Sequence, residues 1–519
     1  MTLLLFSVGV ATVMVMVLWF AQRTGTPPQV CGQSQNPLKP NPVIESLATE
    51  LSDVVLLRGN TEAFDKSIEG YWAQQEREVT QAAIVQPHNA SELAKVVAFL
   101  RREYDMQCLH KEKQFDDVLF AIRGGGRSPV TGSASASGEV SVGVGCQWID
   151  VSRILDEEGL NVVGGRSSES FQLPVDLTLT VYAEDICFFT PQFGLGCSNV
   201  LEYEVVLASG EIITATASSY PDISKALKGG SDNFCVVTRF TLRCFPSTDI
   251  WFGFIHAPGS QSTKALTAVH EAARRADSKM NGTDADPYAA GAITCFNYVQ
   301  AMGIRVISVY LGYTKVPEIS GQWPKSGYAK LWRYWSDFKI HSQTSASNVI
   351  SSTSPAGQRW PFATTTIKND LSTIMATYAI FDDSIATLPK IKGFFYTLNM
   401  QPLLPSWVKK GEPSIPGISE STSDALIIVS FSLRWDRAED DSQVSNTIRK
   451  VIECIDAAAT EKGISHPYRY LNYCANCQRP LEGYGEKNFN FLRDVSRAYD
   501  PDGLFQRGCR GGFKLESTI

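Results

Sequence analysis

A run of three glycines that directly follows an apolar strand constrains the fold more than any other feature of the chain. Val118-Leu-Phe-Ala-Ile122 has the composition of a buried β-strand, and Arg123-Gly-Gly-Gly-Arg-Ser128 continues it. Because glycine has no Cβ atom, the backbone of such a turn can approach a ligand closely and donate its N–H groups to an anion. Arg123 and Arg127 add positive charge. We therefore expect a phosphate cradle at the carboxyl end of a strand, with a plain tight turn as the alternative.

The sequence lacks the two commonest nucleotide-binding motifs. The glycine run does not have the form GxxxxGK followed by Ser or Thr, and no GxGxxG follows a first strand. The charge balance argues against nucleic acid as a partner, because 47 Lys and Arg stand against 54 Asp and Glu, a formal charge of −7. With 519 residues, 44% of them hydrophobic and 19% charged, the chain is predicted to form two or three globular domains.

An uncharged apolar segment runs from Leu3 to Ala21. As a helix it would be about 28 Å long at 1.5 Å per residue, close to the ~30 Å hydrocarbon core of a membrane. Two alternatives stay open: a signal peptide that is cleaved, and a signal anchor that remains. Both predict the secretory pathway, with a secreted or anchored product. Contact with a membrane is expected only through this segment, if it is not cleaved.

Cysteine usage fits that oxidising pathway. The chain has 12 cysteines, which an oxidising compartment allows to pair. The sequons Asn89-Ala-Ser91 and Asn281-Gly-Thr283 are compatible with glycosylation. Cys474-Ala-Asn-Cys477 has the spacing of a redox or zinc motif, but no second such pair and no nearby pair of histidines accompanies it. We expect no metal site.

Strand and helix patterns alternate along most of the chain and predict an α+β fold. A loop-rich stretch is expected from Trp323 to Ala363. The predicted strands are 83–87, 118–122, 200–207, 212–215, 234–242, 306–313 and 425–433, and the predicted helices follow 89–92 and cover 221–227, 260–280 and 441–462.

The glycine turn and a series of further segments resemble one family. Ala121-Ile-Arg-Gly-Gly-Gly-Arg-Ser-Pro-Val-Thr-Gly-Ser133 is similar to the pyrophosphate loop of flavin-dependent oxidases of the vanillyl-alcohol oxidase and p-cresol methylhydroxylase type, fungal berberine-bridge-enzyme-like branch. The resemblance spans roughly residues 50 to 515. The other matching segments are 71–76, 84–87, 159–166, 202–210, 226–230, 233–238, 470–473, 483–485 and 499–501.

The resemblance implies an α+β fold in two parts. A flavin-binding domain of the p-cresol methylhydroxylase type is joined to an α+β substrate domain, and a C-terminal segment returns to the flavin domain. The implied limits are 1–23 for the signal peptide or anchor, 24–78 for the leader and N-terminal segment, 79–247 for the FAD-binding domain, 248–465 for the substrate domain and 466–519 for the C-terminal segment that completes the flavin site.

The resemblance also assigns functional residues. The tyrosine motif Tyr470-Leu-Asn-Tyr473 places a catalytic base at Tyr473, which needs a neighbour to activate it because an unperturbed phenol has a pKa near ~10. The alternative is that Tyr473 packs against the flavin ring without proton transfer. Relatives imply a disulfide between Cys31 and Cys108. The implied FAD contacts are Arg123, Gly124, Gly125, Gly126, Arg127, Ser128, Gly132, Ser133, Gly164, Gly165, Val236, Val237 and Asn472.

The chain departs from the family pattern at three places. Arg127 stands where many relatives have a histidine that bonds covalently to flavin, so noncovalent FAD is expected. A single Glu139 bridges segments that the family separates by a strand and a turn. Residues 167–188 contain no glycine where the family has a glycine-rich flavin loop. They carry four carboxylates instead, which would repel a pyrophosphate: Glu169, Asp176, Glu184 and Asp185.

Two functions follow as alternatives. The first is an FAD-dependent oxidoreductase that takes hydride from a small organic molecule, such as a secondary metabolite or a sugar, with O₂ as acceptor. The second is a catalytically silent flavin-fold protein, or the product of a faulty gene model, whose altered loop 167–188 no longer holds FAD. Core packing is expected for Trp332, Trp335 and Trp360 before a place in a substrate pocket.

Overall fold

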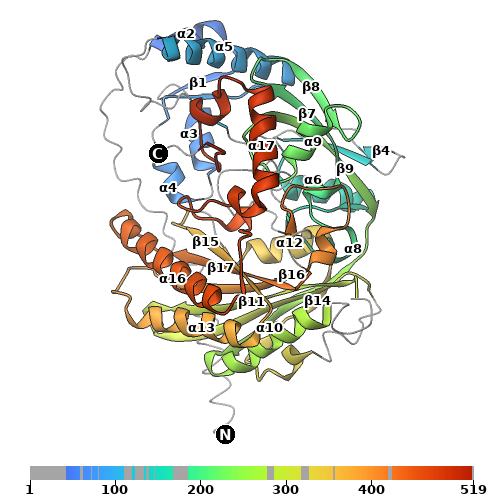
Figure 1. Cartoon of the computed structure of the whole chain (residues 1–519), viewed down its shortest axis with the longest axis vertical. Coiled ribbons are helices and arrows are strands. Elements are labelled where there is room, and N and C mark those ends of the chain that lie inside the picture. The colour runs from blue at the N-terminus through green and yellow to red at the C-terminus, as the bar shows by residue number, and fades with distance from the viewer. Residues whose placement is uncertain are drawn as a thin grey trace.

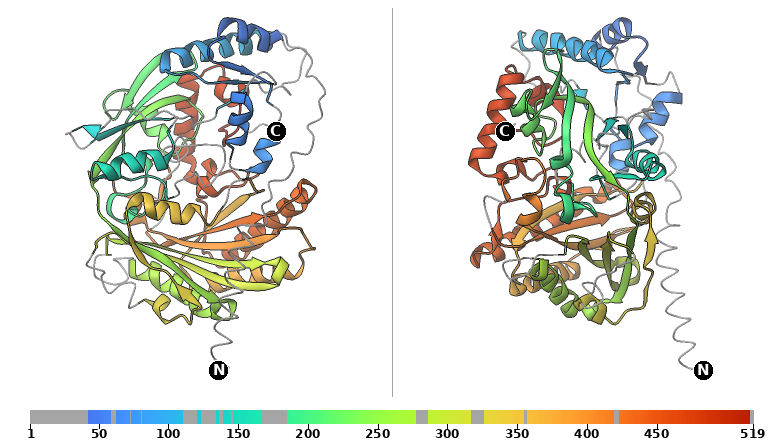
Figure 2. Two further views of the ribbon diagram at one scale, coloured as in Figure 1. Left: turned by 180° about the vertical axis from the view of Figure 1, so that it is seen from behind. Right: turned by 90° about the vertical axis from the view of Figure 1, so that its right-hand side faces the viewer.

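The computed structural model describes residues 42–58, 62–71, 73–79, 81–109, 120–122, 134–135, 139–144, 146–166, 185–276, 286–316, 326–354, 357–418 and 423–516. These residues form two halves, each built on a mainly antiparallel sheet (Figure 1). The views from behind and from the side show the two sheets one above the other, with the C-terminal helix α17 (Glu486–Tyr499) back beside the upper one (Figure 2). The architecture is α+β, as the sequence predicts.

The first sheet is organised around β9 (Cys235–Pro246). Within the described residues, β9 pairs antiparallel with β5, β6 and β7. Exposed and buried residues alternate along β5 and β8, so each has one face on the core and one toward solvent. The other strands of this sheet are β4 (Ala134–Ser135), β5 (Glu139–Gly143), β6 (Leu160–Val162), β7 (Val200–Leu207) and β8 (Ile212–Thr216).

The second sheet has nine strands in the described part of the chain. Strand β17 (Leu426–Arg434) is buried along nearly its whole length, because helices cover one face of the sheet and the first half covers the other. The other strands of this sheet are β10 (Ile250–Pro258), β11 (Ala289–Val299), β12 (Ile304–Tyr313), β13 (Trp335–Ser336), β14 (Lys339–His341), β15 (Phe362–Lys368), β16 (Phe395–Leu403) and β18 (Ser465–His466).

Amphipathic helices cover the two sheets. Val444, Ile448, Val451 and Ile455 follow a helical spacing on α16 and are all buried, so one stripe of this helix faces the core. Besides α17, the described helices are α2 (Pro42–Glu50), α3 (Glu62–Glu69), α4 (Gln74–Arg77), α5 (Ala90–Leu109), α6 (Trp148–Glu157), α8 (Thr190–Phe193), α9 (Pro221–Leu227), α10 (Ser262–Ala276), α12 (Gln343–Ser351), α13 (Leu371–Ala386), α14 (Pro405–Val408) and α16 (Asp441–Glu461).

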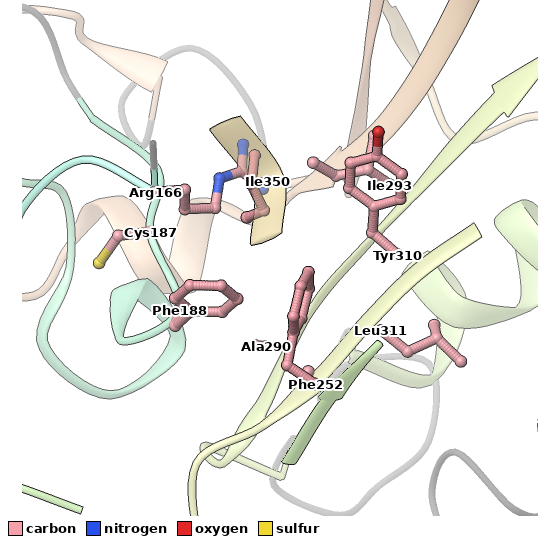
Figure 3. Close-up of a pocket in the computed structure, with 10 residues that line it drawn as sticks. Arg166, Cys187, Phe188, Phe252, Ala290, Ile293, Tyr310, Leu311 and Ile350 are labelled. Atoms are coloured by element: carbon pink, nitrogen blue, oxygen red, sulfur yellow. The ribbon is translucent and has the colours of Figure 1, made fainter. Parts of the chain in front are cut away.

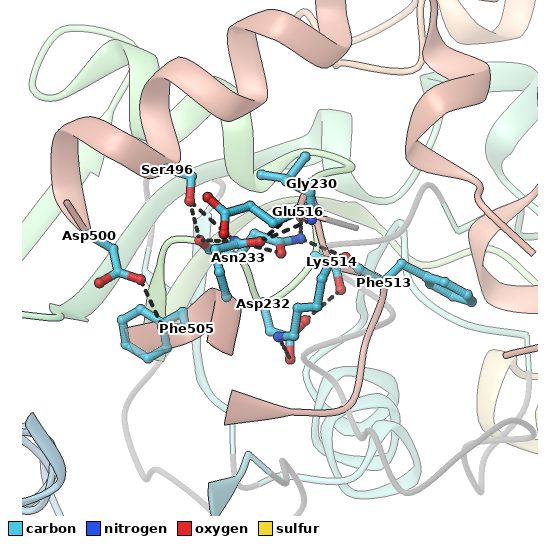
Figure 4. Close-up of polar contacts among 12 residues, drawn as sticks. Gly230, Asp232, Asn233, Ser496, Asp500, Phe505, Phe513, Lys514 and Glu516 are labelled. Atoms are coloured by element: carbon cyan, nitrogen blue, oxygen red, sulfur yellow. Dashed lines mark hydrogen bonds and ion pairs between the residues drawn. The ribbon is translucent and has the colours of Figure 1, made fainter. Parts of the chain in front are cut away.

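Both ends of the described chain join the first half. Near the N-terminus, β1 (Val55–Leu57) pairs with β2 (Ala83–Val85). Near the C-terminus, β19 (Cys509–Arg510) pairs in parallel with β3 (Phe120–Ala121). Asn233 fixes this return, because its Nδ2 donates to the carbonyls of Gly230 at 2.7 Å and Phe513 at 2.8 Å (Figure 4). The C-terminal segment therefore holds the start of β9.

Most predicted elements are confirmed within one to four residues, but the loop-rich stretch 323–363 is wrong. It contains α12, whose sequence is rich in Ser, Thr and Asn and therefore has low helix propensity. The helix forms because Ala346 and Ile350 are buried against the first half, and because Ser342 caps its N-terminus by accepting from the Ser345 N–H. Asp441 begins α16, as expected.

Several predictions fall outside the described residues. They are the apolar segment 3–21, the leader up to residue 41, Cys31 and with it the Cys31–Cys108 pairing, Asn281, and three of the four carboxylates. No disulfide joins the cysteines of the described segments. Among the described helices, none has both the length and the apolar character needed to cross a membrane. The domain limits stay predictions, although the strands change sheet between Pro246 and Ile250.

Candidate active site

The tyrosine motif lies where the two halves meet. It follows β18 and forms a short 3₁₀ turn, Leu471–Tyr473. The rings of Tyr470 and Tyr473 pack edge to face with centroids 4.7 Å apart, and Tyr473 stacks on Phe362 of β15 at 6.2 Å. Tyr470 is only 2% exposed. Buried aromatic contacts of this kind fix ring orientation, so the Tyr473 hydroxyl has a defined direction.

Asp185 lies against the same turn, although it is far away in sequence. Asn472 Nδ2 donates to Asp185 Oδ1 at 3.0 Å, and the Tyr470 hydroxyl donates to the same oxygen at 3.4 Å. The other oxygen, Oδ2, is buried and has no hydrogen-bond partner among the described residues. Burial raises the pKa of Asp185 to about 8, against the charge of Arg166 and the hydrogen bonds from Tyr470 and Asn472, which act to lower it.

Arg166 supplies the positive charge of this cluster. It follows β6 and the two glycines Gly164 and Gly165, and its Nη2 donates to Gln401 Oε1 on β16 at 2.9 Å. Burial raises the pKa of the Tyr473 hydroxyl, while the charge of Arg166 and a hydrogen bond from its guanidinium act to lower it. Arg166 is therefore the neighbour that a tyrosine base requires.

A pocket opens beside Arg166 between the two halves. It is small, and apolar side chains make up most of its wall. Figure 3 shows Arg166, Cys187 and Phe188 on one side, facing Tyr310 and Phe252 from strands of the second sheet. The wall therefore combines apolar side chains with one cationic group, Arg166. The remaining wall residues are Ala290, Ile293, Leu311, Gly312 and Ile350.

A second pocket lies at Gly164 and Gly165, between α6, β6 and α12. Three buried polar atoms on its walls have no hydrogen-bond partner in the described structure: Trp148 Nε1, Asn161 Nδ2 and Gln343 Oε1. A Cβ atom on Gly164 would come within 2.6 Å of the Trp148 ring, so a larger residue does not fit there. Partnerless buried donors and acceptors call for a hydrogen-bonding ligand. This part of the chain therefore fits a neutral, hydrogen-bonding part of a cofactor.

The predicted FAD contacts that the structure describes fall into three groups. Gly164 and Gly165 line the second pocket. Asn472 belongs to the cluster with Asp185, next to Tyr473. Val236 and Val237 lie on β9, paired with Val206 and Val205 of β7, and share no described contact with the other two groups. Arg123, Gly124, Gly125, Gly126, Arg127, Ser128, Gly132 and Ser133 lie outside the described residues.

Two expectations about individual residues need correction. Trp332 and Trp335 do not pack in the core: they are 60% and 40% exposed, because they lie at and beside the edge strand β13 of the second sheet. Trp360, at 6% exposed, is buried as expected. The described segments contain no cluster of His, Cys, Asp and Glu side chains that could hold a metal ion.

Sequence reasoning also missed the roles of Arg166 and Asp185. The signal for Arg166 is its position: it is the last residue of the segment 159–166 that resembles the family, and it directly follows two glycines. Asp185 was assigned a repulsive role toward pyrophosphate. Its described partners are instead Tyr470 and Asn472, residues that no local sequence pattern connects to it.

Curated fungal proteins are similar to this chain over most of its length. The FAD-dependent monooxygenase FUP4 from Fusarium proliferatum is 31% identical over 477 residues, which cover 86% of this chain and 87% of that protein. The FAD-dependent monooxygenase tpcD from Cochliobolus heterostrophus is 29% identical over 479 residues, with the same two shares of 86% and 87%. No protein-family model matches the chain.

Solved structures share the fold. Glucooligosaccharide oxidase from Acremonium strictum gives a TM-score of 0.68 at 15% identity and covers 92% of this chain and 100% of its own. A BBE-like 1 protein from Physcomitrella patens gives 0.67 at 15% identity and covers 91% and 99%. With the sequence relatives, they establish that the chain belongs to the berberine-bridge-enzyme-like family of FAD-dependent oxidoreductases, within the vanillyl-alcohol oxidase and p-cresol methylhydroxylase group.

Proposed function

We propose that this protein is an oxidase that removes hydride from a carbon bearing a hydroxyl or amino group on a small organic molecule, with Tyr473 as the base. The observation that carries the proposal is the Tyr473 hydroxyl beside the Arg166 guanidinium, in a partly buried side chain at the junction of the two halves. Bound FAD would accept the hydride and pass two electrons on to O₂. Gly164, Gly165 and the polar atoms around them would help to hold the FAD.

The chain's own residues would handle the proton. Tyr473 takes the proton from the substrate O–H or N–H, and the electron pair of that bond forms the new C=O or C=N double bond as the adjacent C–H bond breaks. Arg166 stabilises the phenolate form of Tyr473 and so increases the fraction of Tyr473 that is deprotonated, and able to accept a proton, at a given pH. The apolar walls of the first pocket keep water away from this step.

The names of the relatives support a small organic substrate. Two are FAD-dependent monooxygenases, and a bifunctional solanapyrone synthase from Alternaria solani is 27% identical over 433 residues. Because monooxygenase is the activity in those names, the assay must separate the two chemistries. An oxidase releases one H₂O₂ for each substrate oxidised, whereas a monooxygenase inserts an oxygen atom from O₂ into its product. Measuring O₂ uptake, H₂O₂ and product mass for one substrate tests the oxidase proposal.

We also propose that FAD is held noncovalently, since Arg127 cannot serve as the nucleophile that a histidine provides. Acid precipitation of the flavin-loaded protein should leave flavin fluorescence in the supernatant. Fluorescence that stays with the denatured polypeptide would refute this.

The apolar segment Leu3 to Ala21 and the two sequons support a route through the secretory pathway. A mobility shift on deglycosylation of the expressed protein would agree with that route. A full-length, unglycosylated product in the cytosol would contradict it.

A further inference from the structure

Asp185 occupies the active-site cluster without a part in the proposed reaction. Its Oδ1 accepts from the Asn472 amide at 3.0 Å and from the Tyr470 hydroxyl at 3.4 Å. Asn472 Nδ2 also lies 3.2 Å from the Tyr470 hydroxyl, so the three groups form one closed set of contacts. The Ile186 N–H, next to Asp185 in the chain, donates to the Tyr470 hydroxyl at 3.3 Å. Asp185 thus holds the turn that carries Tyr473.

Tyr470 links this carboxyl group to Tyr473. Tyr470 makes two contacts in this link. Its hydroxyl donates a hydrogen bond to Asp185, and its ring packs edge to face on the Tyr473 ring, with centroids 4.7 Å apart. Tyr470 cannot move freely, because its side chain is 2% exposed and packs in the core of the first half. A change at Asp185 is therefore transmitted to Tyr473 through a rigid contact.

Few groups around Tyr473 carry charge near neutral pH. Burial raises the pKa of Cys187 to about 11, that of Cys295 to about 12, and those of Tyr310 and Tyr470 further still. These four groups are therefore neutral. Among the described residues around Tyr473, Arg166 carries a positive charge, and Asp185 adds a negative charge once it is ionised, with the opposite effect on the Tyr473 phenolate.

We propose that Asp185 is a positioning residue that restrains the base: it orients Tyr473 through Tyr470 and Asn472, and in its ionised form it opposes the negative charge of the Tyr473 phenolate. The two effects have different pH ranges. The hydrogen bonds act at any pH, whereas the charge appears only as pH rises through about 8, where Asp185 loses its proton. This inference deepens the proposed function and rests on Tyr473 as its base.

The test is a titration of Tyr473 that requires no substrate. Tyrosinate forms a characteristic ultraviolet absorbance, and subtraction of the Tyr473→Phe protein isolates the signal of Tyr473 from those of the other tyrosines. In Asp185→Asn, which keeps the shape and the hydrogen-bond acceptor, the Tyr473 signal should appear at lower pH than in the unaltered protein. Removal of a nearby like charge is the reason.

Two further variants distinguish the effect of the Asp185 charge from a nonspecific effect of substitution on the structure. Glu204→Gln removes a carboxylate that pairs with Arg239 on the first sheet at 3.0 Å, so it should leave the Tyr473 signal in place. Tyr470→Phe keeps the ring contact and deletes the hydrogen bond to Asp185, and the Tyr473 signal should broaden or move. An unchanged signal in Asp185→Asn, or an equal shift in Glu204→Gln, overturns the inference.

The outcome is separable from that of the proposed function. If Tyr473 is not the base, Tyr473→Phe retains turnover, while the titration still reports whether Asp185 acts on Tyr473. If Tyr473 is the base but Asp185 does not restrain it, Tyr473→Phe loses turnover and the titration curves of Asp185→Asn and the unaltered protein coincide.

Discussion

At the scale of single residues, the site combines a cation, a carboxyl group and two tyrosines in a buried junction. Arg166 directly precedes the altered stretch 167–188, Asp185 lies near the end of that stretch, and Tyr470 and Tyr473 come from the C-terminal part of the chain. Because the site is shielded from water, each charge interacts more strongly with its neighbours than it would in bulk water. In the proposed reaction, the proton affinity of Tyr473 therefore depends on whether Asp185 is ionised.

The base is tested by Tyr473→Phe. Phe keeps the contacts with Phe362 and Tyr470 and removes only the hydroxyl. We expect turnover to fall by about 10² or more at unchanged flavin content, since general base catalysis contributes roughly 10² to 10⁴ in rate. Steady-state kinetics on flavin-loaded protein measures this. Unchanged turnover would place the base elsewhere, and loss of flavin would assign Tyr473 a structural role.

His466 gives a second residue-scale prediction, on stability. Burial lowers its pKa to about 4, helped by the charges of Lys368 and Arg469. The folded state therefore keeps His466 neutral between about pH 4 and pH 6.5, where the unfolded chain binds a proton. Because only the unfolded chain binds this proton, proton binding favours unfolding in that pH range. The free energy of unfolding should therefore rise as pH increases from 4 to 6.5.

Thermal unfolding midpoints across that pH window provide the measurement. His466→Gln should reduce the slope, because Gln can still accept from the Tyr468 N–H, which donates to His466 Nδ1 at 3.2 Å, but does not titrate. His88→Gln is the matched control, since the His88 side chain is 71% exposed. A slope that is the same in all three proteins would contradict the assignment to His466.

At the scale of elements, one arginine joins three segments. Arg359, which is 4% exposed, pairs with Glu78 at 2.7 Å and with Asp441 at 2.6 Å, the first residue of α16. It thereby ties the N-terminal segment to the second sheet and its covering helix. Asp441 also accepts from Trp435 Nε1 at 2.7 Å. A guanidinium suits this site because it can donate to two carboxylates at once.

Arg359→Ala should destabilise the protein by about 1–3 kcal/mol, less than the loss of a fully buried pair because both carboxylates remain partly exposed. The urea midpoint of unfolding reports the change. Arg437→Ala, which breaks an exposed pair with Glu439, is the control and should move the urea midpoint much less. Equal effects of the two substitutions would show that the Arg359 bridge is no stronger than an ordinary surface pair.

The elements also show what could be predicted from sequence. Strands such as β7 and β17 and the helix α16 have strong periodic patterns, and they were predicted almost to the residue. Helix α12 was missed because its own residues favour turns, and contacts with the first half make it a helix. Tyr473 and Asn472 could be assigned from a motif. The contact of Asp185 with that motif could not, since it joins segments distant in sequence.

At the scale of the whole molecule, the C-terminal segment and the two sheets enclose the candidate site together. The first half contributes Arg166 and Asp185, the second sheet contributes Gln401 and Tyr310, and the segment after β18 contributes Tyr473. The fold and the family predict a flavoenzyme. Residues 167–188 are the largest departure that we expect from the family pattern, so flavin binding is the property on which the proposed function depends.

Flavin content of the purified full-length protein tests this most directly. The protein would be incubated with excess FAD, freed of unbound FAD by gel filtration, and its visible flavin absorbance compared with its protein concentration. The account predicts a yellow protein with about one FAD per chain, less in Gly164→Ala, whose Cβ atom would push into Trp148. A colourless, folded protein after this treatment would contradict the account and favour a flavin-fold protein that has lost its cofactor.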